Sequence, residues 1–114
     1  RTRAQTRQAL AREEQAHARL DDLREAVRLE VMRHVIAVER AIAAVAVTRQ
    51  GLQEAEEAYR VMRERVRQGM ALTAEVLSAE VAYRNTQVRH TAALTDYAVA
   101  RAALRRATGE PAQL

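Results

Sequence analysis

Apolar side chains recur every seven residues along most of this chain, and heptad spacing is typical of helices that pack side by side in a coiled coil. One row of positions seven apart contains Val31, Val38, Val45, Leu52, Tyr59 and Val66. A second row, three to four residues on, contains Leu20, Val27, His34, Ala41, Thr48, Ala55 and Met62. The pattern weakens toward the N-terminus, where His17 and Arg24 fall in the stripe. It predicts a helix over about residues 4–68, with the isolated Gly51 tolerated at a cost of about 1 kcal/mol.

A second heptad pattern occupies residues 73–108. Its two main rows contain Val76, Tyr83, His90, Tyr97 and Leu104, and Ala79, Thr86, Ala93, Ala100 and Ala107. A further row beside them contains Val81, Val88, Thr95 and Ala102. One apolar stripe is enough for a helix in an isolated hairpin, so the extra row predicts a helix with neighbours on both flanks.

The two patterns are interrupted at Gly69. Glycine readily takes the left-handed conformation that ends many helices. We expect Thr73 to be the N-cap of the second helix, with Leu72 and Leu77 forming a hydrophobic staple around it. Glu75 falls in the first turn, where the helix dipole favours negative charge. The prediction is an all-α fold: one long antiparallel coiled-coil helical hairpin with an interhelical turn at residues 69–72 and a C-terminal tail at 109–114.

The two expected helices differ in length. At about 1.5 Å per residue, the first spans roughly 95 Å and the second roughly 55 Å. About 29 residues of the first helix should therefore extend beyond the second, and their apolar positions require another partner. The chain starts inside a helical pattern, without methionine, and we expect it to be an excised fragment.

Composition agrees with long helices and argues against several kinds of function. The chain has 3 glycines, 1 proline, no cysteine, no phenylalanine and no tryptophan, so it offers neither disulfides nor thiolate metal sites. The net charge is +4, and no aromatic residues alternate with the basic ones, which disfavours a nucleic-acid surface. Acids and arginines four residues apart predict ion pairs along an exposed face: Glu56, Arg60 and Glu64, and Glu80 with Arg84. The longest apolar run, residues 41–47, is far short of the roughly 18 residues of a membrane span.

Catalytic and metal-binding patterns are weak. Glu14 and His17 have the Glu-x-x-His spacing of di-iron bundles, but no second copy of the pair is present. His34 and His90 fall in the heptad rows, where a hydrogen-bonded seam histidine is the favoured interpretation. Ser78 has no histidine nearby in the sequence. We therefore expect no enzyme, no cofactor and no metal.

The turn and the segments after it resemble the periplasmic helical hairpin of TolC-type outer-membrane efflux proteins. The matching positions are Val66, Gly69, Thr73, Glu75, Val76, Leu77 and Ala79 at the turn, and Asp96, Tyr97, Leu104 and Gly109 near the C-terminus. The order of a long helix followed by a shorter one resembles the second structural repeat of that family. Ser78 stands where the family often has a second carboxylate, so the resemblance does not extend to a two-acid ring at the pore entrance.

The resemblance implies a homotrimeric tunnel in a Gram-negative bacterium. Each full protomer would give two hairpins to a periplasmic helical barrel, and strands outside this chain would make the only membrane contact, in the outer membrane. The tip, defined as Gly69, Met70, Ala71, Leu72 and Thr73, would dock a periplasmic adaptor protein linked to an inner-membrane pump. Glu75 is a possible pore-entrance charge. The implied function is passive export of small molecules or proteins.

Two alternatives remain open at this point. A periplasmic adaptor (membrane fusion protein) also carries a coiled-coil hairpin, but Arg67, Leu72 and Ser78 do not hold the spacing typical of adaptor tips. A generic structural coiled coil used for dimerisation would need the seam but would be indifferent to the sequence of the tip.

Overall fold

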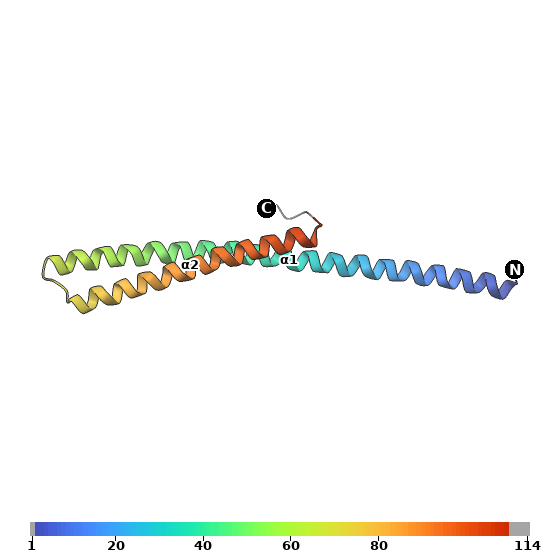
Figure 1. Cartoon of the computed structure of the whole chain (residues 1–114), viewed down its shortest axis with the longest axis horizontal. Coiled ribbons are helices and arrows are strands. Elements are labelled where there is room, and N and C mark those ends of the chain that lie inside the picture. Colours follow the sequence, from blue (N-terminus) through green and yellow to red (C-terminus); the bar gives the residue numbers. More distant parts are fainter. Residues whose placement is uncertain (1, 110–114) are drawn as a thin grey trace.

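The computed structural model describes residues 2–109 and consists of two antiparallel helices, α1 (Arg3–Arg67) and α2 (Thr73–Ala107) (Figure 1). The molecule is a rod of 100 × 26 × 16 Å. The predicted all-α helical hairpin is confirmed, and the two helices are adjacent along the whole length of α2. Residues 110–114 of the expected C-terminal tail lie outside the described residues.

Helix α1 begins with a reciprocal capping arrangement. Thr2 is the N-cap: its hydroxyl accepts a hydrogen bond from the backbone N–H of Gln5 at 3.3 Å, and the Gln5 side chain accepts one from the N–H of Thr2 at 3.2 Å. These two bonds satisfy donors that the first turn of a helix leaves free. The helix then runs through Gly51 without interruption, because the penalty of one glycine is small against 65 helical residues.

The predicted heptad rows form the seam between the helices. From residue 31 onward every member of both α1 rows is half-buried or buried, and the two main rows of α2 are half-buried or buried as well. Within the described residues only Ala41 and Ala93 are buried, at 9% and 6% exposure. Small side chains at these positions let the backbones approach closely, so the core is one side chain thick and needs no bulky filling.

Beyond the end of α2, helix α1 continues alone. All of residues 2–30 are exposed, and this stretch projects as a single helix on the right of Figure 1. Its exposed apolar side chains include Leu10, Leu20, Leu23, Val27 and Leu29. The expected overhang of about 29 residues is therefore present, with no partner in the described structure.

The extra row of α2 lies away from the seam. Val81 and Val88 are 58% and 68% exposed, and Thr95 and Ala102 are exposed as well. Val88 and His90 are two residues apart, which is about 200° around a helix, so this row faces nearly opposite to α1. Helix α2 thus carries two apolar stripes and covers only one of them.

The ion pairs in the described part of the chain all join residues of the same helix. Arg84 bonds Glu80 at 2.8 Å, as predicted from their spacing. The prediction for Arg60 was wrong in detail: its Nε donates to Glu57 at 2.9 Å, three residues away, and not to Glu56. On a helix both i−3 and i−4 neighbours are within reach, and the bidentate geometry with Glu57 decides between them.

Candidate functional site at the hairpin tip

Helix α1 ends in a Schellman motif. Gly69 has φ +73°, the left-handed conformation predicted for it. Its N–H donates to the carbonyl of Val66 at 3.0 Å, and the N–H of Met70 donates to the carbonyl of Arg65 at 2.8 Å. These two bonds satisfy carbonyls at the helix end and fix the direction of the chain into the tip.

The predicted N-cap of α2 was wrong by one residue, although the helix begins at residue 73 as expected. Leu72, with extended backbone (φ −84°, ψ 150°), is the N-cap, and Thr73 is already the first helical residue. Leu72 and Leu77, the residues of the expected staple, are 71% and 54% exposed, so most of each side chain remains uncovered. Threonine is preferred at the N-cap because its hydroxyl accepts a hydrogen bond, which a leucine side chain cannot do. The length of the turn overrides this local preference and places Leu72 at the N-cap.

Glu75 performs the capping that Thr73 does not. Its Oε2 accepts a hydrogen bond from the backbone N–H of Leu72 at 2.8 Å. The carboxylate also lies in the first turn of α2, where the helix dipole stabilises it. One carboxylate oxygen of the predicted pore-entrance residue is therefore engaged in holding the tip together, and the other is not used in this bond.

The tip exposes two large apolar side chains on a rigid turn. Met70 is 72% exposed and Leu72 is 71% exposed, while Ala71 between them is half-buried. The backbone beneath them is held by the Schellman bonds on one side and by Glu75 on the other. Five predicted docking residues are thus brought together at one end of the rod, although Thr73 belongs to α2.

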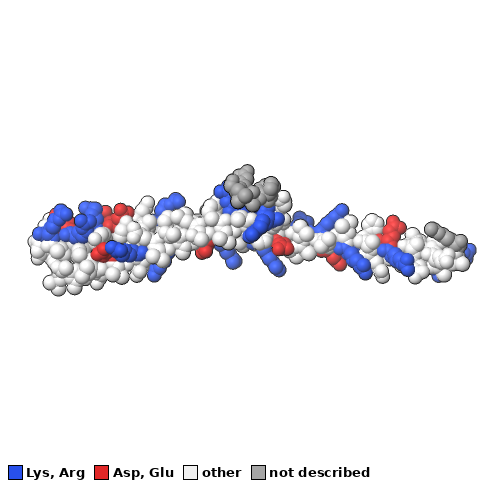
Figure 2. All heavy atoms as spheres, viewed as in Figure 1, with Lys and Arg blue, Asp and Glu red and all other residues white. Residues whose placement is uncertain are grey.

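Arginines gather behind the tip on α1, as Figure 2 shows at the left end of the molecule. Arg60 pairs with Glu57, and Arg67 lies 3.5 Å from Glu64. The Arg60 guanidinium, mainly through its hydrogen bond, holds the pKa of the Glu57 carboxyl below its ordinary value. Part of the local positive charge is therefore neutralised within α1 itself.

An aromatic stack joins the helices a few turns above the tip. The rings of Tyr59 and Tyr83 are stacked with centroids 5.9 Å apart, and the Arg63 guanidinium lies 5.4 Å from the Tyr59 centroid. The heptad rows contain both tyrosines, but sequence reasoning missed their contact. The signal was available, since an antiparallel turn at residues 69–72 brings these two positions to nearly the same level.

Near the middle of the hairpin a polar pair crosses the seam. The Thr48 hydroxyl lies 3.0 Å from Nδ1 of His90, which confirms the expectation of a hydrogen-bonded seam histidine. His34 lies 3.8 Å from Glu30, and His17 lies 3.9 Å from Glu13 and not from Glu14. Within residues 2–109 no three histidine, aspartate or glutamate side chains come together to hold a metal ion.

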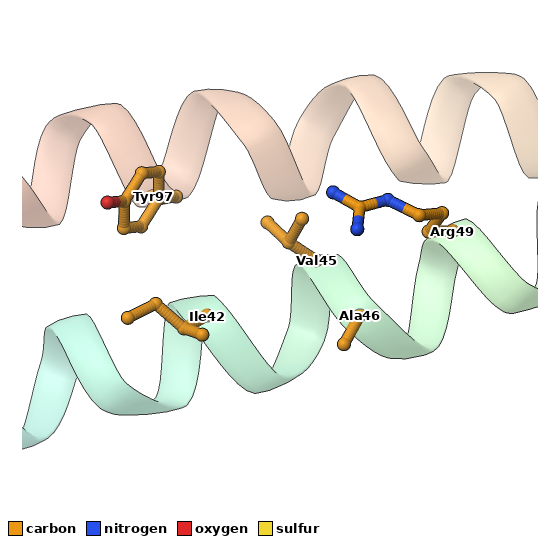
Figure 3. A pocket seen from close by; sticks show the side chains of 5 residues that line it. All are labelled: Ile42, Val45, Ala46, Arg49 and Tyr97. Carbon is orange, nitrogen blue, oxygen red and sulfur yellow. The ribbon is translucent and has the colours of Figure 1, made fainter.

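Next to the Thr48–His90 pair, a shallow groove of about 320 Å³ opens between the helices. Ile42, Val45, Ala46 and Arg49 line it from α1 and Tyr97 from α2 (Figure 3). A second groove, on α1 alone, lies beside the arginines and includes Val61, Met62 and Arg65. The second groove also includes Glu54 and Glu57, but Glu57 is paired with Arg60, and neither groove brings a nucleophile together with a base.

Comparison with known proteins identifies one relationship. The family model described as outer membrane efflux protein matches residues 1–110, which is nearly the whole chain. Searches of curated proteins and of solved structures each returned no match. Within residues 2–109, neither α1 nor α2 contains an apolar stretch that could span a bilayer.

Proposed function

The chain belongs to the outer membrane efflux protein family, and from this membership we propose that it is a periplasmic tunnel segment of an efflux or secretion channel whose tip docks an adaptor. In this proposal the hairpin is one stave of a helical barrel built by three protomers. The barrel conducts small molecules or proteins passively from an inner-membrane pump toward the exterior.

One observation carries the stave proposal: α2 has apolar stripes on two opposite sides and covers only one. The uncovered stripe contains Leu77, Val81, Val88 and Val99, all more than half exposed. A helix in a closed ring has a neighbour on each side, so both stripes would then be buried. In α1, Met32, Ile36 and Val47 are exposed on the side away from α2 and provide the matching outer flank.

The tip is proposed as the docking end because it combines exposure with rigidity. Met70 and Leu72 present apolar surface at a single point, and a preorganised turn loses little conformational freedom on binding. Glu75 is proposed to supply one acid per hairpin at the entrance through the oxygen that does not cap α2.

The test separates docking from assembly in the full-length protein produced in Gram-negative cells. Changing Met70 and Leu72 together to serine should leave the trimer intact and abolish both export and cross-linking to the adaptor. Val88→Ser should instead weaken trimer assembly, because Val88 lies on the outer stripe and far from the tip. Circular dichroism of the 114-residue chain should show both variants fully helical. Normal export with a serine tip would refute the docking role and favour a generic structural coiled coil.

A further inference from the structure

We propose that Tyr59 and Tyr83 form a site of oxidative cross-linking, at which a one-electron oxidant joins α1 to α2 through a dityrosine bond. The two rings lie on different helices, their centroids are 5.9 Å apart, and their planes differ by 11°. The proposal concerns the chemistry of the hairpin itself and goes beyond the proposed function, on which it does not rest.

The near-parallel stacking of the two rings is the orientation that this coupling requires. The unpaired electron of a tyrosyl radical is spread over the ring, including the carbons next to the one that bears oxygen, and it occupies lobes above and below the ring plane. A carbon–carbon bond between two such radicals therefore forms face to face. Rings at right angles would instead aim the C–H edge of one ring at the face of the other. The 11° angle between Tyr59 and Tyr83 keeps their faces toward each other.

Both rings are held in place before any reaction occurs. Tyr59 and Tyr83 belong to the heptad rows of the seam and are half-buried between the helices. The Arg63 guanidinium lies 5.4 Å from the Tyr59 centroid and adds a cation–π contact to that ring. The hydrogen-bonded turn at residues 69–72 fixes the level of α2 against α1, so the two rings meet within one molecule without diffusion.

The coupling removes two electrons and two protons in total. Each phenol gives one electron to the oxidant and one proton to water, which leaves two tyrosyl radicals. These radicals join through one new bond between ring carbons next to the hydroxyl-bearing carbons. The hydrogen on each joined carbon then moves to the ring oxygen, which restores both aromatic rings and both hydroxyl groups. The product is lighter by two hydrogen atoms and has its helices linked covalently.

Tyr97 is the matched internal control. It is the third of the chain's 3 tyrosines, and it is half-buried in the seam like the other two. It lies fourteen residues beyond Tyr83 on α2, which is about 21 Å along the helix. Its neighbours in the groove are Ile42 and Val45 rather than a second ring. A Tyr97 radical therefore has no partner ring at coupling distance in the same molecule.

Photo-oxidation of the 114-residue chain with a ruthenium tris-bipyridine complex and persulfate tests the proposal. The main cross-linked product should run at monomer mass on a denaturing gel, show dityrosine fluorescence and lack two hydrogen atoms. Tryptic digestion should yield the peptide 50–60, which contains Tyr59, joined to the peptide 68–84, which contains Tyr83. Tyr59→Phe should lower the intramolecular yield at least about tenfold, whereas Tyr97→Phe should change it less than about twofold.

The yield of this product per molecule should not change on dilution, because both rings belong to one chain. Cross-links that involve Tyr97 as often as the Tyr59–Tyr83 pair would overturn the proposal, and so would a yield that falls with dilution. Oxidation of Tyr59 and Tyr83 without coupling would overturn it as well. The peptide mapping uses the unmodified chain, so its result does not depend on whether a tyrosine variant folds.

Discussion

Residues 3–30 and residues 31–67 belong to the same helix, yet they are held in different ways. The second stretch buries its heptad rows against α2, whereas every residue of the first is exposed, including Leu20 and Val27 in the same register. Helix formation by itself is marginal in water, and most helical stability in proteins comes from packing an apolar face. The overhang is therefore helical by propensity and by continuity with the paired stretch, and its apolar side chains are available to another partner.

Limited proteolysis with trypsin should show the largest difference between the two stretches. All 19 basic residues are arginine, and they occur throughout α1, so both stretches offer cleavage sites. Because cleavage requires local unfolding, sites such as Arg12 and Arg19 should be cut at least about tenfold faster than Arg40 and Arg49. Mass spectrometry of the early fragments measures this, and equal rates would show that the overhang is covered or self-supporting.

A buried charge should distinguish the stretches next. Ala41→Asp places a carboxylate at a buried position of the seam, and should lower the free energy of unfolding by roughly 3 kcal/mol. Ala16→Asp, in the overhang, makes the same chemical change on an exposed face and should cost about 0.7 kcal/mol, the difference in helix propensity. Urea denaturation followed by circular dichroism compares the two. A similar loss for both would mean that Ala41 is not in a packed seam.

Two glycines, one in the turn and one inside the paired stretch, should respond with opposite signs. Gly69 has φ +73°, so Gly69→Ala should destabilise the chain by about 1–2 kcal/mol. Gly51 is helical, and a methyl group there would meet no atom within 4 Å, so Gly51→Ala should stabilise it by about 1 kcal/mol. Thermal unfolding of both variants is sufficient, and a stabilising Gly69→Ala would contradict the Schellman ending.

The Thr48–His90 pair tests the contribution of one polar contact to the seam. Thr48→Val leaves Nδ1 of half-buried His90 without its partner and should cost about 1 kcal/mol. His90→Leu leaves the Thr48 hydroxyl bonded to its own helix carbonyls and should cost less, or stabilise the seam. Chemical denaturation compares the free energies of unfolding of the two single variants. A larger loss of stability for His90→Leu would contradict the assignment of Thr48 as the acceptor and His90 as the donor of this hydrogen bond.

The smallest effect is expected at the exposed Glu57–Arg60 pair. The pKa of Glu57 is lowered in the folded chain, so its contribution is present above the ordinary carboxyl pKa and is lost as the pH falls through the lowered value. Arg60→Ala should raise the pKa of Glu57 toward its ordinary value, with a barely measurable change in stability. A nuclear magnetic resonance titration of the Glu57 side chain measures the shift. Arg84→Ala, which breaks a different pair, should leave it unchanged.

The seam and the turn were predictable because each depends on a local or periodic property. Heptad spacing identified the half-buried rows, and the preference of glycine for positive φ identified Gly69. The N-cap was misplaced at Thr73 because propensity ranks side chains but does not measure how many residues a turn needs. The hydrogen bond from the Leu72 N–H to Glu75 depends on Leu72 being the N-cap, so it could not be predicted while Thr73 was assigned to that position.

Contacts across the seam were harder to predict than the seam itself. Tyr59 and Tyr83 were placed in their rows, but their stacking depends on the relative level of two helices, which the turn geometry sets. The partner of Arg60 depended on rotamers that spacing alone does not fix. The role of the tip in docking depends on a second molecule and stays a prediction that the adaptor cross-linking experiment addresses.

Because the ion pairs within residues 2–109 never pass from one helix to the other, electrostatic screening acts on the two rods separately. Raising the ionic strength should weaken the ion pairs that support each helix slightly, while the apolar packing between α1 and α2 stays as strong or strengthens. The pairing of α1 with α2 should therefore persist over a wide range of salt concentrations.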